Sequence, residues 1–140
     1  MIELKINGNP IPQKRHRYRR ASNRIISYDP NSRDKQAFAM QLASMMHSKP
    51  FNEPLSVEMI FYMKRPKSHF RTGKYSHKLK KGIGEDHSKK PDIDNLVKFV
   101  MDSGNKILWK DDACISHLRT MKVYSLNPRT EIRIWTQSES

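Results

Sequence analysis

The sequence predicts an α+β fold, a single domain over residues 1–140 in which two main helices pack on a mixed or antiparallel sheet of about four strands. Three observations support this prediction. Four segments show the residue pattern of strands, and two others carry apolar residues at helical spacing. Their order is strand, helix, strand, long loop, helix, strand, strand, without an internal repeat, which suits helices layered on one sheet. A chain of 140 residues can also bury a modest core.

The strand predictions rest on the alternation of apolar and polar residues. Ile2, Leu4 and Ile6 alternate with polar neighbours, so residues 2–7 are predicted as a strand that ends at Asn7-Gly8. Two further strands are expected at roughly 113–123 and 129–136. The clearest strand is predicted over 54–63, where five apolar side chains share one face: Leu55, Val57, Met59, Phe61 and Met63.

The helix predictions rest on apolar residues three and four positions apart. The turn residues at 29–32 precede a helix predicted over about 33–47, with Asn31 or Ser32 as its N-cap. Its apolar face carries Phe38, Leu42, Met45 and Met46. A second helix is predicted over about 92–103, closed by Gly104-Asn105, with an apolar stripe of Ile93, Leu96, Val97, Val100 and Met101.

Basic residues dominate the charge of the chain. There are 27 Lys and Arg residues against 14 Asp and Glu, which gives a formal net charge of +13 and a pI near 10. Such a charge attracts phosphate, so nucleic acid is the leading expected partner. An anionic membrane surface is the weaker expectation, because no long basic amphipathic helix is visible. The mean hydropathy of −0.84 is low, but the pattern above predicts a folded domain with long basic loops.

Several protein classes do not fit this sequence. No apolar run approaches the roughly 18 residues of a membrane span, and the first residues lack a signal-peptide pattern. The single cysteine, Cys114, excludes an intrachain disulfide and suits a reducing, cytoplasmic location. One cysteine and six scattered histidines also give no zinc-type ligand spacing. We therefore expect no membrane attachment and no small-molecule cofactor.

Two strongly basic segments are expected to contact DNA. Residues 14–20 hold five Lys or Arg residues in seven positions, and a long loop over 64–90 holds ten, with three His and two acids. A solvated, mobile segment is the alternative for 14–20, and Phe70 or Tyr75 is either a wedge for opened DNA or a local packing residue. The expected DNA-binding residues are Lys14, Arg15, Arg17, Tyr18, Arg19, Arg20, Arg71, Lys74, Lys89 and Lys90.

Acidic residues gather in one short region against this basic background. Five of the 14 acids fall between positions 92 and 112. Carboxylates there would repel phosphate unless a cation lies between the two. Mg²⁺ is a hard ion that takes one or two carboxylates, keeps several waters and bridges to phosphate oxygens. The region therefore predicts a metal-dependent enzyme that acts on nucleic acid.

The spacing of these acids suggests how a metal would be held. If Asp92 stays extended and Asp94 opens the first helical turn, both carboxylates point into one cleft. Lys98 follows one turn later, and Asp111 and Asp112 are expected to begin the next strand. A metal held by Asp92, Asp94 and one of the later pair would keep open positions for a water that attacks a phosphodiester.

A purely structural interpretation of the same residues remains open from local pattern alone. An Asp at a helix start is common capping chemistry, and Asp94, Lys98 and Asp102 have the spacing of i,i+4 ion pairs. Paired Asp residues before a strand are common in turns.

Two longer motifs resemble those of a known family. Residues 90–99 read KPDIDNLVKF and residues 109–113 read WKDDA, which resemble the signature of the RusA family of Holliday junction resolvases. The Pro10-x-Pro12 segment with its basic residues and the strand that begins at Pro128 also resemble that family. The similarity extends over essentially the whole chain. One departure is the 64–90 loop, which is longer and more basic than in shorter members.

The resemblance implies a small dimeric, Mg²⁺-dependent endonuclease, with Mn²⁺ as a substitute, that cuts four-way DNA junctions by paired symmetric nicks. Such enzymes occur in phages and prophages, so the expected location is the cytoplasm of a bacterial or phage-infected cell. The essential acids of the family fall on Asp92, Asp94 and Asp112, its catalytic-site lysine falls on Lys98, and Asp111 is a possible accessory. The alternatives are a non-catalytic basic nucleic-acid-binding protein and a flap or single-strand nuclease on the same scaffold.

Overall fold

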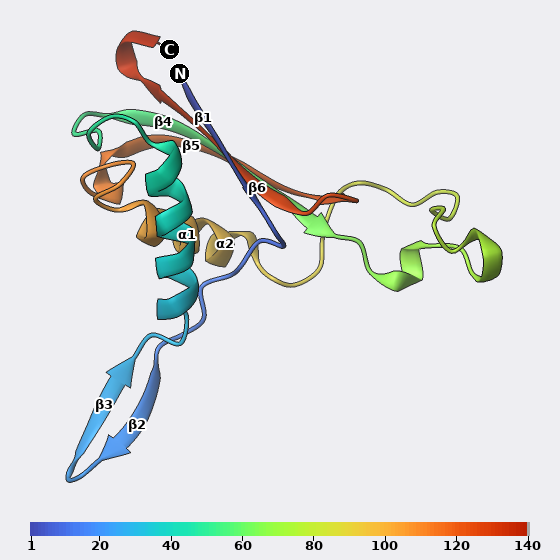
Figure 1. The fold of residues 1–140 in the computed structure, drawn as a ribbon, viewed down its shortest axis with the longest axis horizontal. Coiled ribbons are helices and arrows are strands. Elements are labelled where there is room, and N and C mark those ends of the chain that lie inside the picture. The colour runs from blue at the N-terminus through green and yellow to red at the C-terminus, as the bar shows by residue number, and fades with distance from the viewer. Residues whose placement is uncertain (140) are drawn as a thin grey trace.

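A four-stranded mixed sheet forms the centre of the computed structural model, which describes residues 1–139 (Figure 1). Its strands are β1 (Ile2–Asn7), β4 (Leu55–Lys64), β5 (Ile115–Ser125) and β6 (Arg129–Thr136), in the spatial order β1-β6-β4-β5. β6 pairs antiparallel with both β1 and β4, whereas β4 and β5 are parallel. The predicted α+β fold with a mixed sheet is confirmed.

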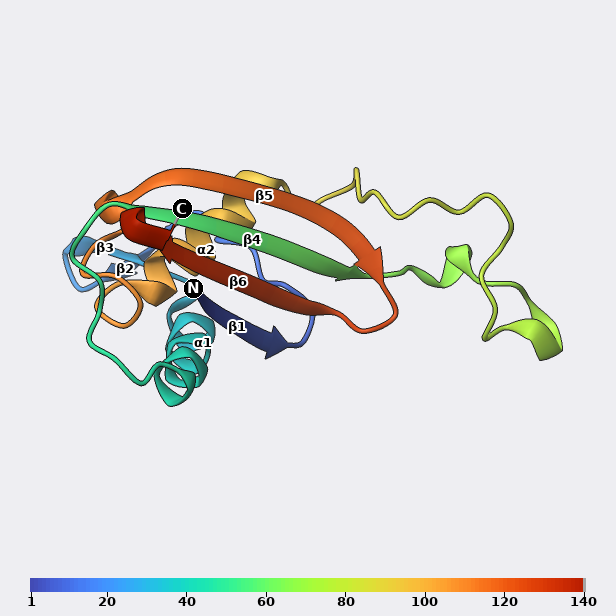
Figure 2. The same cartoon turned by 90° about the horizontal axis from the view of Figure 1, so that it is seen from above.

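Two helices, α1 (Ser32–Met45) and α2 (Ile93–Gly104), cover one face of this sheet (Figures 1 and 2). The five apolar residues predicted to share a face of β4 are all buried beneath them. Phe38 of α1 and Phe99 of α2 meet edge to face, with ring centroids 5.4 Å apart, and join the helices to each other. Leu96, Val97 and Val100 of the predicted α2 stripe are also buried.

The parallel pairing of β4 and β5 determines where α2 lies. Parallel neighbours need a long crossover, and here it consists of the loop after β4, then α2, then a short 3₁₀ turn at Asp112–Cys114. β5 was expected to begin near residue 113, but it begins at Ile115, and the acids before it stand in this turn. Asp111 caps the turn by accepting a hydrogen bond from the backbone N–H of Ala113, which explains the difference.

A second, two-stranded antiparallel sheet projects away from the body of the molecule (Figure 1). It consists of β2 (Arg17–Ala21) and β3 (Arg24–Tyr28), joined at Ser22-Asn23, where Ser22 has a φ of 55°. Two-residue hairpin turns favour such positive φ values. The sequence did not predict these strands, because the arginines in β2 hide any core-facing alternation.

The predicted loop over 64–90 is present and extends beyond the end of the sheet (Figure 2). It contains two 3₁₀ turns, Lys67–His69 and Gly73–Tyr75. Its base is held at the end of β5, where the rings of His69 and His87 each lie 4.7 Å from that of Tyr124. The base of the loop therefore packs against the sheet, whereas the tip of the loop lies far from the sheet.

The expected cap of α1 differs in its chemistry. Asn31 occupies the N-cap position, but its side chain makes no capping hydrogen bond. Its Oδ1 instead accepts from the backbone N–H of Lys14 at 2.6 Å and from Nε2 of Gln13 at 3.3 Å. Asn31 thus joins the segment before β2 to the start of α1. Among residues 1–139, no helix is long and apolar enough to cross a membrane.

Candidate active site and nucleic-acid interface

The first acidic group stands at the start of α2. Asp92 is extended, with φ −69° and ψ 145°, and Asp94 lies in the first turn, which is the local geometry that the sequence suggested. Nζ of Lys90 donates to Oδ1 of Asp92 at 2.8 Å, and this hydrogen bond lowers the pKa of Asp92. Both acids are exposed, so the helix start presents two carboxylates to solvent.

Lys122 of β5 holds the segment that leads into α2. Its Nζ donates to the carbonyl oxygens of Lys89 and Pro91, each at 2.8 Å, and the Lys90–Pro91 peptide bond is cis. The positive charge of Lys122 also contributes to the lowered pKa of Asp92. The position of the first acidic group is thereby set by β5 as well as by the helix.

The second acidic group is the Asp111–Asp112 pair in the turn before β5. The two carboxyl groups share a hydrogen bond, which raises the pKa of Asp112 and lowers that of Asp111. Partial burial and the negative charge of Asp102 raise the pKa of Asp112 further. Two carboxyl groups in contact cannot both ionise at low cost without a nearby cation. This pair is therefore the part of the molecule where a bound cation would relieve most repulsion.

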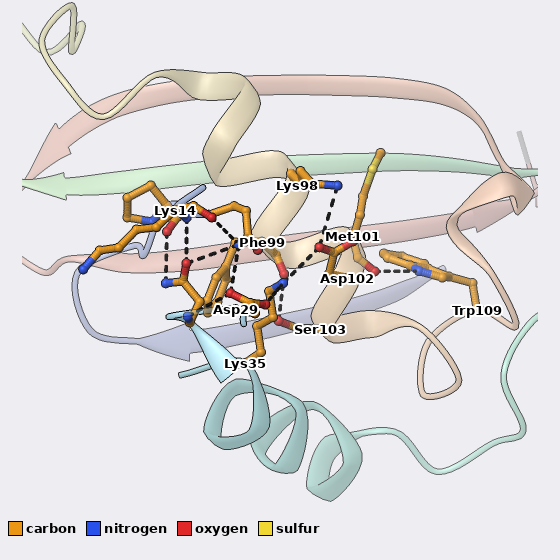
Figure 3. A network of polar contacts seen from close by, with 12 residues as sticks. Lys14, Asp29, Lys35, Lys98, Phe99, Met101, Asp102, Ser103 and Trp109 are labelled. Carbon is orange, nitrogen blue, oxygen red and sulfur yellow. Dashed lines mark hydrogen bonds and ion pairs between the residues drawn. The ribbon is translucent and has the colours of Figure 1, made fainter. Parts of the chain in front are cut away.

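Lys98 belongs to a network of polar contacts that joins α2 to α1 (Figure 3). Its Nζ is 3.9 Å from Oδ2 of Asp102, so the i,i+4 ion pair that the spacing allowed is present. The side chain of Lys98 remains 64% exposed, and its charge also acts on Asp112, where it opposes the rise in pKa. Lys98 can thus approach a ligand while remaining electrostatically linked to Asp112.

Asp102 connects this lysine to α1 (Figure 3). Nζ of Lys35 donates to Oδ2 of Asp102 at 3.1 Å and to Oδ2 of Asp29 at 2.7 Å. Partial burial opposes the charge on Lys35, but these two hydrogen bonds raise its pKa above the usual value. Sequence reasoning missed Lys35, because no local spacing relates it to a residue 67 positions away.

The acids predicted to hold a metal come from two segments of the chain. Asp92 and Asp94 stand at the start of α2, after the segment held by Lys122, whereas Asp111 and Asp112 lie in the turn before β5. Within residues 1–139, no three His, Cys, Asp or Glu side chains gather as one metal-binding cluster. The donor chemistry does fit a hard cation, since each group offers carboxylate oxygens and the charges of Asp111 and Asp102 both disfavour ionisation of Asp112.

Two basic grooves flank these acids. One, of about 390 Å³, lies between the segment before β2 and α2, and is lined by Gln13, Lys14, Arg15, His16, Asn95, Lys98 and Asp102. The other, of about 620 Å³, lies at the base of the long loop, and its lining includes Lys64, Arg65, Lys67, Phe70, Lys89 and Lys90. Four of the expected DNA-binding residues, Lys14, Arg15, Lys89 and Lys90, therefore line grooves that reach the start of α2.

The remaining expected DNA contacts lie on the two projections. Arg17, Tyr18, Arg19 and Arg20 belong to β2 and are exposed. Arg71 and Lys74 lie over the ring of Tyr75, at 4.6 and 5.2 Å from its centroid, near the tip of the loop. Phe70 forms a bridge with Leu79. Tyr75 therefore packs locally against basic side chains, whereas Phe70 is paired through its backbone and lines the groove at the base of the loop.

Comparisons with known proteins identify the family of this chain. Residues 7–135 match the family described as Endodeoxyribonuclease RusA. The chain is 31% identical over 135 residues to the uncharacterized protein YqaN of Bacillus subtilis, covering 95% of this chain and 94% of that protein. It is 25% identical over 136 residues to a crossover junction endodeoxyribonuclease, rusA, of Lactococcus phage r1t, covering 95% of each. Because the match extends over nearly its whole length, the chain belongs to the RusA family of endodeoxyribonucleases.

Proposed function

We propose that this protein is a Mg²⁺-dependent endonuclease that resolves four-way DNA junctions by paired symmetric nicks. The observation that carries the proposal is the family match over residues 7–135, within which the start of α2 presents exposed acids between two basic grooves. The phage relative is named for crossover junction cleavage, which supports the same substrate. Mn²⁺ is expected to substitute for Mg²⁺, and the reaction would take place in the cytoplasm of a bacterial or phage-infected cell.

Several acids would bind the metal ion together. Asp92, Asp94 and Asp112 would supply its carboxylate oxygens, with Asp111 as an accessory, and the bound ion would supply an activated water and neutralise phosphate charge. Because no three such side chains gather within residues 1–139, binding of the ion and the substrate would bring the two acidic groups together around the metal. The pairing of Asp92 with the exposed Lys90 is compatible with this, since exposed ion pairs are weak and exchange readily.

Lys98 would act on the substrate directly. Its exposed ammonium group lies in the groove beside α2 and is loosely paired with Asp102 at 3.9 Å. A phosphate in this groove would meet the ammonium group, which can stabilise the negative charge that develops during cleavage. Asp102 is itself held by Lys35 and would keep Lys98 pointed into the groove.

Paired symmetric nicks require two active sites. A four-way junction has approximate two-fold symmetry, so a C2 homodimer would place one site on each of two opposite strands. We therefore propose that the active species is a homodimer on branched DNA. Sedimentation of the free protein and of its junction complex would test this directly.

The function is tested by incubating a labelled four-way junction with Mg²⁺ or EDTA and three proteins: the wild type, Asp92→Asn and Asp34→Asn. Asp34 is an exposed acid in the first turn of α1, so its substitution removes the same charge at a comparable position away from the proposed site. We expect paired nicks from the wild type and Asp34→Asn in Mg²⁺ alone, and none from Asp92→Asn, which still binds the junction.

Other outcomes would favour the alternatives. Tight binding without cleavage in either Mg²⁺ or Mn²⁺ would indicate a non-catalytic nucleic-acid-binding protein. Faster cleavage of a flap or a single strand than of the junction would indicate a different nuclease on this scaffold. An Asp92→Asn protein that cuts as fast as Asp34→Asn would overturn the assignment of the acids.

A further inference from the structure

The β2–β3 hairpin contributes little to the fold that carries it. None of residues 17–28 is buried, and Tyr18 and Ile25 are 71% and 68% exposed. Two-stranded ribbons are marginally stable in water unless something packs against them. An ordered hairpin with large exposed side chains therefore indicates a surface that acquires a partner.

Both faces of the hairpin carry the same kinds of side chain. The register pairs Arg17 with Tyr28 and Arg19 with Ile26 on one face, and Arg20 with Ile25 on the other. A ribbon that covers a protein core has one apolar and one polar face, and this hairpin has neither. Arginine and large apolar residues on both faces suit a partner that surrounds the ribbon on two sides.

The major groove of duplex DNA has these properties. It is about 12 Å wide, admits a two-stranded ribbon and has phosphates along both of its walls. The hairpin strands have five residues each, so they reach roughly 17 Å, with a spacing of roughly 5 Å between them. The length and width of the arm are therefore of the size that a groove accepts.

The charge of the hairpin favours DNA as its partner over a second copy of this chain. Residues 14–28 contain six Lys or Arg residues and no Asp or Glu. Two such hairpins would repel each other, and the net charge of +13 opposes docking of a hairpin on a second copy of the chain. Duplex DNA supplies the negative charge along the whole length of the arm.

The base of the hairpin is fixed relative to α2. The backbone N–H of Gln13 donates to the carbonyl oxygen of Asn95 at 2.9 Å, and the backbone N–H of Lys14 donates to Oδ1 of Asn31 at 2.6 Å. Asp29, just after β3, is held by Lys35. The base of the arm is thus preorganised, and the groove lined by Lys14, Arg15 and Lys98 joins it to α2.

We propose that the β2–β3 hairpin inserts into the major groove of a duplex arm, away from the point of cleavage, and holds that arm at a set angle to α2. This inference rests on the proposed function for the identity of the DNA as one arm of a junction. It adds Arg24, Ile25 and Tyr28 to the contact surface, none of which lies in the basic run that the sequence singled out.

The test is methylation protection of guanine N7, an atom that faces the major groove. It is carried out on a four-way junction in EDTA, so that no cleavage is needed. The variant Arg19→Gln/Arg20→Gln removes one arginine from each face, and its control, Lys5→Gln/Lys49→Gln, removes the same charge from exposed positions elsewhere. All four substituted residues are exposed, and matching thermal unfolding curves would verify that both variants fold.

We expect the wild type and the control to protect guanines within one duplex arm, and the hairpin variant to leave those guanines unprotected. The log–log slope of binding against salt should fall by about 1.8, because each of the two arginines that no longer neutralises a phosphate accounts for about 0.9. A reduced slope with no guanine protected by any protein would overturn groove insertion. A changed oligomeric state with unchanged slope and protection would identify the hairpin as a dimer contact instead.

Failure of the nuclease proposal gives a different result. A wild type that protects guanines in a duplex arm but never cuts a junction in Mg²⁺ would leave the hairpin proposal standing and remove the catalytic one. A wild type that cuts junctions while protecting no guanine would do the reverse.

Discussion

Asp102 and Asp112 both lie within electrostatic reach of Lys98, yet their surroundings are opposite. Asp102 has Lys35 at 3.1 Å and Lys98 at 3.9 Å, so its charge is matched by two cations. Asp112 has Asp111 as its closest partner, and its pKa is raised by that contact. The charge of Asp102 is already neutralised by its lysine partners, so this carboxylate stabilises the fold. The charge of Asp112 is opposed by Asp111, so binding of a cation or a proton would stabilise this carboxylate.

The same distinction separates the other acids. Asp29 is partly buried and accepts hydrogen bonds from Lys35, from Gln13 and from the backbone N–H of Asn31. Asp92 is exposed and has one exposed lysine as its partner. A partner that is exposed can be exchanged for a ligand at little cost, and one that is partly buried cannot. The number and burial of the cationic partners therefore divide the acids into structural and functional groups.

The largest effect is expected from Asp112→Asn compared with Asp102→Asn. Loss of a carboxylate that holds a catalytic ion removes several kcal/mol of transition-state stabilisation, so cleavage by Asp112→Asn should fall on the order of 10³-fold. Asp102→Asn acts through Lys98 and through its charge on Asp112, and it should slow cleavage by about 10-fold while lowering stability. Single-turnover rates on a four-way junction measure both. Equal reductions in cleavage rate for the two variants would contradict the division into a metal-binding Asp112 and a structural Asp102.

A smaller effect is expected from Lys35→Met, which leaves both Asp29 and Asp102 without their shared cation. The side chain of Lys35 is 17% exposed, and hydrogen bonds to charged groups contribute about 1.5–3 kcal/mol. We expect the free energy of unfolding to fall by about 2 kcal/mol, as a lower urea midpoint with an unchanged m value. Lys49→Met, at an exposed position, is the matched control.

A double-mutant cycle sharpens this result. Adding Asp29→Asn to Lys35→Met removes one of the two stranded charges, so the double variant should lose less stability than the sum of the two single ones. Additive effects would show that the charges of Lys35 and Asp29 do not stabilise each other in the folded protein.

An effect of similar size to that of Lys35→Met is the pH dependence that comes from Asp29. Partial burial opposes its ionisation, but hydrogen bonds from Lys35, Asn31 and Gln13 outweigh it and lower its pKa from 3.8 to about 2. Because the folded-state pKa is the lower one, the stabilisation is present above pH 3.8 and is lost as the pH falls towards 2. Its size is about 2 kcal/mol, at 1.36 kcal/mol for each pKa unit.

Urea unfolding between pH 7 and pH 2 measures this contribution. The difference in stability between the wild type and Asp29→Asn should shrink as the pH falls through this window. A difference that stays constant with pH would contradict the lowered pKa, because an Asp with equal pKa values in the folded and unfolded states contributes no pH dependence.

The fold was largely predictable from local pattern. β1, β4 and both helices lie where alternation and helical spacing placed them, since each follows from which of its own residues are apolar. The extended Asp92 and helical Asp94 were also foreseen, because the proline before them and the apolar stripe after them define the start of α2. Lys98 and Asp102 form the i,i+4 pair that their spacing allowed.

The remaining features depend on residues that are distant in sequence. The hairpin was not predicted because its strands bury nothing, so no core-facing pattern was selected in them. Asn31 occupies the predicted N-cap position of α1, but its side chain makes no capping hydrogen bond, because it binds Gln13 and Lys14 of another segment instead. The convergence of Asp92, Asp94 and Asp112 on one metal ion stays a prediction, because these acids come from two separate segments and no three such side chains gather within residues 1–139.

By itself the sequence determined the secondary structure of the core, the basic surface and the acidic motifs that mark a RusA-family chain, because these depend on residue type and short-range spacing. Only the tertiary structure decided which acids are neutralised, since Lys35 reaches Asp29 and Asp102 through the packing of α1 on α2. It also decided that β2 and β3 form a free arm beside the groove of Lys98, because hydrogen bonds from Gln13 and Lys14 hold their base against α2 and the start of α1.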